Sequence, residues 1–167
     1  YYQRLFAQCT AVMLAIQRVP VPVIARVQGL ATAAGCQLVA MCDLAVASHD
    51  ARFAVSGINV GLFCATPGVA LSRNLSRKAA FEMLVTGDFI SADAARELGL
   101  VNRVAAAEKL DDEVEALVAR IVGELTDIMG KDKVTTELVA AVIRLTATET
   151  ANGDKLDKIA NRIGRAA

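Results

Sequence analysis

The part of the sequence that most constrains the fold runs from Pro22 to Leu38 and reads PVIARVQGLATAAGCQL. It opens with Val23–Val27, a short run rich in β-branched residues that is typical of a strand with both faces buried. Gly29 then stands where the chain must turn, small residues follow, and the apolar stretch Cys36–Met41 has the length of a short helix. A strand, a turn and a helix in this order predict an α/β fold. The small-residue turn also predicts free backbone N–H groups at the helix N-terminus.

Further strands and helices are predicted on both sides of this segment. Before it, apolar residues recur at helical spacing over Leu5–Ile16, and Pro20 ends that helix. After it, we expect strands at Leu44–Ala47, Arg52–Val55 and Leu100–Val104, a Gly-containing loop at Ser56–Gly68, and helices at Lys78–Val85, Ala92–Leu98, Glu108–Glu124, Lys131–Thr146 and Asp154–Ile163. Residues 1–107 are therefore expected to form a core and residues 108–167 a helical C-terminal region.

Composition limits the classes of protein to which such a chain can belong. Hydrophobic residues make up 54% of the sequence and its mean hydropathy is +0.42. Even so, the best apolar run, Leu38–Val46, is interrupted by Asp43 and falls well short of the ~20 residues of a membrane-spanning helix. The surplus therefore predicts buried α/β structure and a subunit interface, without membrane insertion. Eighteen Lys and Arg balance 18 Asp and Glu and form no block, which argues against a nucleic-acid partner.

The residues that could hold a metal ion are few and scattered. Cys9, Cys36, Cys42 and Cys64 lie in apolar surroundings without a CxxC pair, and His49 is the one histidine of the sequence. This pattern predicts neither a metal site nor a bound cofactor, and it favours reduced thiols in an intracellular compartment. Because the sequence opens without a Met or a signal segment, we expect the natural chain to continue upstream.

The Pro22–Leu38 segment resembles the signature of the crotonase superfamily, that is, of the enoyl-CoA hydratase/isomerase family. The blocks that extend the resemblance in the family's order are Cys42–Ala47, Phe53 leading into Gly57–Gly61, Thr86–Ala92, Ala94–Ala95 and Gly99–Val101. The match runs from about Cys9 to Arg120 and is most similar to the enoyl-CoA hydratase domain-containing subgroup.

The resemblance implies both a fold and a class of ligand. The fold is a crotonase-like (ClpP/crotonase) α/β spiral of ββα units, here truncated at the N-terminus and followed by a helical region. The ligand is an acyl-CoA thioester, with coenzyme A as part of the substrate and no other cofactor. A homo-trimer or hexamer is expected, located in the cytoplasm of a bacterium or the mitochondrial matrix of a eukaryote.

The family's chemistry depends on stabilising a thioester oxygen that gains negative charge. Two fixed backbone N–H groups donate to that oxygen, and the resemblance assigns one of them to Ala34, where the dipole of the predicted helix assists. The family's second donor lies in a loop that would precede Tyr1. The resemblance places these further residues around the substrate: Ala31, Ala33, Gly35, Gly61, Pro67 and Gly68. A purely structural alternative is that Ala33–Gly35 only permits close packing of helix and strand.

Hydration in the family uses two glutamates that position water and exchange protons with the substrate. At the matching positions this sequence has Gln37 and Gly57. An amide does not act as a base near neutral pH. Gly57 offers no side chain, although its small size leaves room for a bound anion that could serve as the base. The Gly61–Gly68 loop is also longer than in typical hydratases. We therefore expect acyl-CoA binding with little or altered hydration.

Other polar residues are weaker candidates. Cys36 with His49 as its base would resemble a peptidase of the related Clp fold, but the required triad is missing and Cys36 precedes an apolar helix, which favours a buried, unreactive thiol. We expect His49 at the surface, Asp43 in a turn, and Glu82 and Glu97 in solvent. Two functions stay open: an acyl-CoA-binding protein with altered chemistry, and a non-catalytic assembly or regulatory subunit of the same fold.

Overall fold

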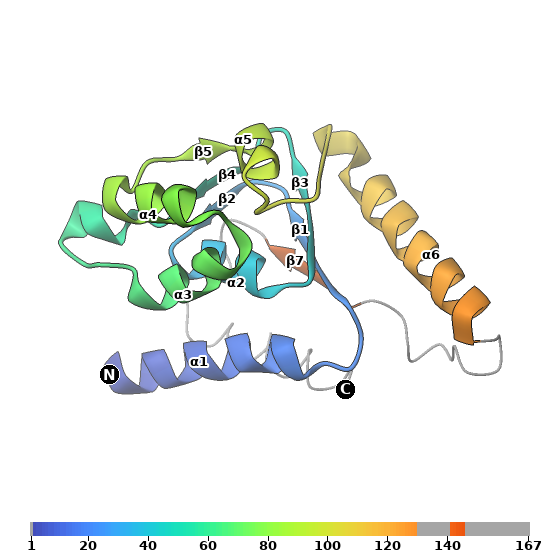
Figure 1. Cartoon of the computed structure of the whole chain (residues 1–167), viewed down its shortest axis with the longest axis horizontal. Coiled ribbons are helices and arrows are strands. Elements are labelled where there is room, and N and C mark those ends of the chain that lie inside the picture. The colour runs from blue at the N-terminus through green and yellow to red at the C-terminus, as the bar shows by residue number, and fades with distance from the viewer. Residues whose placement is uncertain (1, 130–140, 146–167) are drawn as a thin grey trace.

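The computed structural model describes residues 2–129 and 141–145, which form a mixed α/β fold (Figure 1). The helices are α1 (Tyr2–Arg18), α2 (Ala34–Met41), α3 (Ala65–Asn74), α4 (Arg77–Thr86), α5 (Ala92–Glu97) and α6 (Leu110–Met129), with 3-10 turns η1 (Ser56–Val60) and η2 (Ala107–Lys109). The strands are β1 (Val23–Val27), β2 (Leu30–Thr32), β3 (Leu44–Ser48), β4 (Arg52–Ala54), β5 (Ile90–Ser91), β6 (Arg103–Ala105) and β7 (Ala141–Leu145). One sheet has the order β6-β3-β1-β7 with parallel neighbours, and the other has the order β2-β4-β5. Among these residues, no helix is both long enough and apolar enough to cross a membrane.

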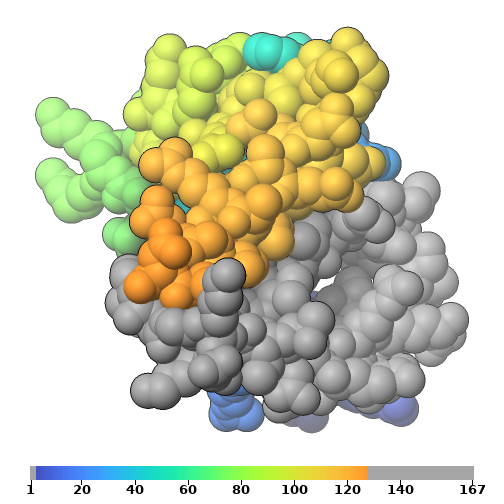
Figure 2. Space-filling model, turned by 90° about the vertical axis from the view of Figure 1, so that its right-hand side faces the viewer, coloured from blue at the N-terminus to red at the C-terminus, as the bar shows by residue number. Residues whose placement is uncertain are grey.

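Strand β1 occupies the middle of the larger sheet because its side chains are apolar on both faces. Val23 and Ala25 belong to the main core, which also contains residues of α1 and α2. Ile24 instead packs with Leu110 in a second cluster beneath α6. Figure 2 shows α6 as a yellow-to-orange ridge across one face of the molecule. Alternate residues of one strand thus bury two cores, and the helix predicted at Glu108–Glu124 is confirmed as α6.

Two polar side chains fix the register of the larger sheet. Oδ2 of Asp43 accepts from the Val23 N–H at 2.7 Å, and the Asp43 N–H donates to the Val23 carbonyl at 2.9 Å. Asn102 forms the same kind of reciprocal pair with Ala45, at 2.8 and 2.9 Å. Asp43 thus lies at the junction between α2 and β3, as predicted, but its side chain bonds to β1 and does not form the local cap or turn that was expected.

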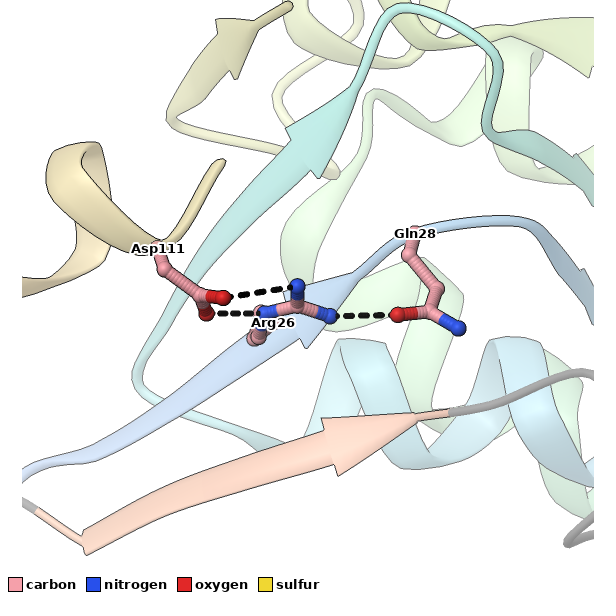
Figure 3. A network of polar contacts seen from close by, with 3 residues as sticks. All are labelled: Arg26, Gln28 and Asp111. Carbon is pink, nitrogen blue, oxygen red and sulfur yellow. Dashed lines mark hydrogen bonds and ion pairs between the residues drawn. The ribbon is translucent and has the colours of Figure 1, made fainter. Parts of the chain in front are cut away.

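Arg26, near the end of β1, joins the sheet to the start of α6 (Figure 3). Its Nε and Nη2 donate to the two carboxylate oxygens of Asp111 at 2.6 and 3.2 Å, and Nη1 donates to Oε1 of Gln28 at 2.6 Å. The Arg26 side chain is only 12% exposed, so this bidentate pair is more strongly held than an ordinary surface ion pair. The network holds the chain just before it leaves the larger sheet.

The chain enters the smaller sheet through β2, a strand that the sequence did not predict. Ala31 of β2 pairs with Phe53 of β4, and both residues are buried. Ala and Gly are poor strand formers, so the local sequence gives little signal here. Pairing with β4 makes the strand, and β2 leads directly into the turn before α2.

Local sequence signals do account for α4 and α5. The hydroxyl of Ser76 accepts from the Ala79 N–H at 3.3 Å, and that of Ser91 accepts from the Ala94 N–H at 3.2 Å. Gly87, with φ of 68°, ends α4 in the left-handed conformation. The helices predicted from residues 78 and 92 are confirmed.

Other segments also differ from the sequence-based predictions. The expected strand Leu100–Val104 begins only at Arg103, in β6. The expected loop Ser56–Gly68 contains η1 and the first residues of α3. The expected helix Lys131–Thr146 is wrong at Ala141–Leu145, which forms β7 and pairs in parallel with β1. The Val-Ile sequence within this segment is compatible with a strand or with a buried helix face. Hydrogen bonding to β1 makes it a strand. The rest of that segment and the expected helix Asp154–Ile163 lie outside the described residues. The division into residues 1–107 and 108–167 stays a prediction.

Candidate functional site

The turn before α2 has an unusual backbone. Ala33 has φ of 47° and ψ of −112°, and within residues 2–129 and 141–145 it is the one non-glycine residue with a positive φ. Such a conformation costs on the order of 1–3 kcal/mol and persists only where the surroundings enforce it. Here the Ala33 N–H donates to the Ala54 carbonyl at 2.9 Å, and the Ala33 carbonyl accepts from the Gln37 N–H at 3.0 Å. The smaller sheet and α2 together hold the turn.

This turn presents the N–H of Ala34, the first residue of α2. An N–H in the first turn of an α-helix has no acceptor within its own helix. Elsewhere in the described residues, too, the Ala34 N–H forms no hydrogen bond. Ala34 is half-buried, and the positive end of the helix dipole adds to the attraction for a negative oxygen. The predicted position of Ala34 at a helix start is confirmed, whereas its role toward a thioester stays a prediction.

Helices α2 and α3 lie side by side and run in the same direction. At their C-terminal ends, the Asn74 amide donates to the carbonyls of Ala40 and Ala70 at 2.8 and 2.9 Å. Near their N-terminal ends, Cys64 lies close enough to Cys36 to raise the pKa of its thiol, as described below. Both helix N-termini therefore lie near the Ala33 turn, where their dipoles favour negative charge.

Several predicted substrate-binding residues serve the packing around this turn. Ala31 is buried in the main core, Gly35 is buried in the first turn of α2, and Pro67 is buried in the first turn of α3. A side chain at Gly68 would meet Leu84 of α4 at 3.2 Å. Gly68 thus allows α3 to approach α4. These four residues contribute to packing around the Ala33 turn, and their contact with substrate stays a prediction.

Gln37 and Gly61 are more accessible. Gln37 is half-buried on the first full turn of α2, and its side chain forms no hydrogen bond within the described part of the chain. Gly61 is exposed at the end of η1 with φ of 77°, where a side chain would be strained. Gln37 therefore has a free amide near the Ala34 donor.

The space beside Gly57 is closed, which contradicts the expectation that a bound anion could fit there. A Cβ added at Gly57 would stand 2.6 Å from both the Leu62 carbonyl oxygen and the Cys64 sulfur. The Leu62 N–H also donates to the Gly57 carbonyl at 2.9 Å, so the loop folds back on η1. The expectation failed because glycine in a sequence shows only that a side chain is missing, not what fills its place.

Cys36 and His49 do not form a catalytic pair, as expected. Cys36 is fully buried, and its pKa is raised to about 12, first by burial and then by the nearby Cys64 thiol. Its thiol therefore stays protonated and unreactive at neutral pH, as predicted. His49 is exposed and lies 3.6 Å from a carboxylate oxygen of Asp93, as expected of a surface residue. Glu82 is exposed as well.

Large apolar side chains remain exposed beside the Gly57 segment. Those on η1, the following loop and the start of α3 are Ile58, Val60, Leu62, Phe63 and Val69. Those on α4 and just after it are Phe81, Val85 and Phe89. The two groups are neighbours, because a side chain at Gly87 would touch Ile58 at 2.7 Å. Apolar surface of this extent indicates that something binds to it.

Three features of the site were missed from sequence. The strained backbone of Ala33 gives no signal in the sequence, because a positive φ is expected from sequence chiefly at glycine. The approach of Cys64 to Gly57 depends on how the loop folds. Asn74, which ties α2 to α3, was missed because no helix was predicted to end there.

Comparison with known proteins gives a consistent result. The sequence model of the family described as "Enoyl-CoA hydratase/isomerase" matches residues 2–158. "Enoyl-CoA hydratase domain-containing protein 3, mitochondrial" of Danio rerio is 44% identical over 163 residues, which are 98% of this chain and 56% of the relative. The Homo sapiens protein of the same name is 49% identical over 135 residues, 81% of this chain and 45% of the relative. The chain thus spans about half the length of these relatives.

Solved structures agree. An enoyl-CoA hydratase of Mycobacterium smegmatis is 60% identical with a TM-score of 0.72, covering 99% of this chain and 61% of its own. The human enoyl-coenzyme A hydratase domain-containing protein 3 is 40% identical with a TM-score of 0.70, covering 100% of this chain and 64% of its own. The crotonase fold expected from the sequence is therefore confirmed.

Proposed function

Because the chain belongs to the enoyl-CoA hydratase/isomerase family, we propose that it binds fatty acyl-CoA thioesters and places the thioester oxygen at the N–H of Ala34. The observation that carries this proposal is the free N–H of Ala34, held in place by the strained Ala33 backbone. A donor fixed in advance needs no reorganisation when the thioester oxygen gains charge.

The same site is proposed to do little hydration. Gln37 is an amide, and Gly57 has neither a side chain nor space for one. The Ala34 N–H polarises a bound thioester, but no carboxylate stands at either family position to activate water. The exposed apolar residues beside η1 would take the acyl chain. The proposal includes a homo-trimer or hexamer, located in the cytoplasm of a bacterium or the mitochondrial matrix of a eukaryote.

A pair of ligands that differ in one atom tests the oxyanion role. Butyryl-CoA carries the thioester oxygen, whereas S-butyl-CoA has the same chain without it. One hydrogen bond contributes about 0.5–1.5 kcal/mol, so butyryl-CoA should bind about two- to twelvefold more tightly by isothermal titration calorimetry. Equal affinities would contradict the role of Ala34. If neither ligand binds, acyl-CoA binding itself is wrong.

A second function is a non-catalytic assembly or regulatory subunit of the same fold. The observation that favours it is the closed space at Gly57. Because the loop fills the proposed carboxylate position, a single substitution at Gly57 would not restore a catalytic side chain. Crotonyl-CoA that binds without any turnover, by this chain or by its Gln37→Glu variant, would favour this second function.

A further inference from the structure

The Cys64 thiol stands where a side chain at Gly57 would begin. A Cβ at Gly57 would lie 2.6 Å from the Cys64 sulfur. By the family resemblance, Gly57 occupies the position of a catalytic glutamate. The group nearest to that vacated position is therefore a thiol. Cys64 is half-buried and so can meet a ligand, whereas Cys36 and Cys42 are buried.

Two observations place this thiol beside the first turn of α2. Cys64 directly precedes α3, whose N-terminus lies at the same end as that of α2. The Cys36 thiol, which is fully buried and has no hydrogen-bond partner among the described residues, lies close enough to Cys64 for the two to interact electrostatically. Cys36 is only two positions beyond Ala34. The Cys64 thiol and the Ala34 N–H therefore lie at the same end of the paired helices α2 and α3.

From this geometry we propose that Cys64 adds covalently to the β carbon of an α,β-unsaturated acyl-CoA whose thioester oxygen is held by the Ala34 N–H. The inference rests on the proposed function and names a reaction of the same site. An enoyl thioester accepts a nucleophile at its β carbon, the carbon that water attacks during hydration. A thiol in place of the water-activating carboxylate is itself such a nucleophile.

The step is balanced without any further reactant. The sulfur bonds to the β carbon as the carbon–carbon π bond opens, and the electron pair moves toward the thioester oxygen at Ala34. The α carbon then takes a proton from water, while the thiol proton passes to solvent. The net change is the addition of S–H across the double bond, with coenzyme A retained. The N-termini of α2 and α3 favour the negative charge that develops on the thioester oxygen of the enolate.

Intact-mass spectrometry after incubation with crotonyl-CoA and an acid quench tests this reaction. We expect one adduct per chain with the full mass of crotonyl-CoA, mapped by peptide analysis to Cys64. Cys64→Ser should abolish the adduct. The matched control Cys9→Ser should retain it, because Cys9 is a partly buried thiol on α1. Butyryl-CoA, which is saturated, should give no adduct.

A second measurement uses the unaltered chain, so that misfolding of a variant cannot confuse the result. Butyryl-CoA at ten times its Kd leaves about one site in eleven free, so it should slow alkylation of Cys64 by iodoacetamide about tenfold. Alkylation of Cys9 should not change. Unchanged alkylation of Cys64 would overturn the inference.

The remaining outcomes separate this inference from the proposed function. Butyryl-CoA that binds while crotonyl-CoA forms no adduct would overturn the inference alone. A mass gain of the crotonyl group without coenzyme A would also overturn it, since that product indicates attack on the carbonyl carbon. An adduct on Cys9 would do the same. If neither thioester binds, both proposals are overturned.

Discussion

The turn at Ala33 and the η1 segment at Gly57 are the two places where the family's chemistry would reside, and they are built in opposite ways. At Ala33, hydrogen bonds to β4 and within α2 hold a costly backbone conformation, so that an N–H stays free. At Gly57, the backbone folds back on itself and fills the space that a catalytic side chain would need. One place leaves an N–H free of partners among the described residues, whereas the other has the space beside its backbone filled.

Under the proposal that Gln37 and Gly57 stand at the family's glutamate positions, this difference distinguishes an open position from a filled one. If only a glutamate side chain had been lost at Gly57, a gap would remain beside the backbone. A Gly57→Glu substitution would then place a carboxylate there without any movement of the loop. Here the Leu62 carbonyl and the Cys64 sulfur occupy the start of that side chain. The loop must move before a carboxylate can return, whereas Gln37 can be replaced without such movement.

The largest expected effect concerns the rate of hydration, and it compares position 37 with position 57. Each missing acid or base is worth ~10²–10⁴-fold, so crotonyl-CoA should be hydrated at least that much more slowly than by relatives with both carboxylates. Gln37→Glu should raise the rate more than Gly57→Glu, because only the first position is open. The loss of enoyl absorbance measures both. An unaltered chain as fast as such relatives, or a larger gain from Gly57→Glu, would contradict the comparison.

A smaller effect is expected on stability at the closed position. Gly57→Ala should lower the free energy of unfolding by about 1–3 kcal/mol, because its Cβ would overlap the Leu62 carbonyl and the Cys64 sulfur. Gly29→Ala is the matched control, since nothing lies within 4 Å of a Cβ there, and it should change stability by less than about 0.5 kcal/mol. Urea denaturation measures both. Equal changes in the free energy of unfolding for the two variants would mean that the loop at Gly57 can move aside at little cost.

The smallest expected effect concerns the strain at the turn. Ala33→Gly should raise the free energy of unfolding by about 1 kcal/mol, because relief of 1–3 kcal/mol of strain exceeds the entropy cost of glycine. Ala34→Gly, at a helical backbone position, should instead lower it by about 0.5–1 kcal/mol. Opposite signs in chemical denaturation would support the strained turn. Losses of equal size would show that Ala33 stores no strain.

Much of the fold could be predicted from sequence because its signals are local. The apolar run of β1 and the capping serines of α4 and α5 each predict their element without reference to distant residues. Strands β2 and β7 could not be assigned in this way. Ala31 and its neighbours form a strand because β4 lies beside them, and the Val-Ile run of β7 is compatible with either period until it pairs with β1.

The candidate site was predictable only as a set of positions. The small residues before α2 correctly located Ala34 at a helix start, and the resemblance located Gln37 and Gly57. The backbone torsion at Ala33 depends on its hydrogen bond to Ala54, which is distant in sequence, and the placement of Cys64 over Gly57 depends on how the loop between them folds. Contacts of this kind decide whether the space beside a small residue is open or filled, and they cannot be predicted from the residue types alone.

The pairing of β7 with β1 has a consequence for how the protein folds. Val23 lies opposite Ala141, so β1 pairs on one side with a strand that lies far along the sequence. Parallel pairing over such a separation carries a high loop-closure cost and slows folding. Until residues 141–145 have been synthesised, β1 lacks the hydrogen bonds that it makes to them, and that edge of β1 can pair with other chains. Slow synthesis or truncation before β7 would therefore favour aggregation over the native sheet.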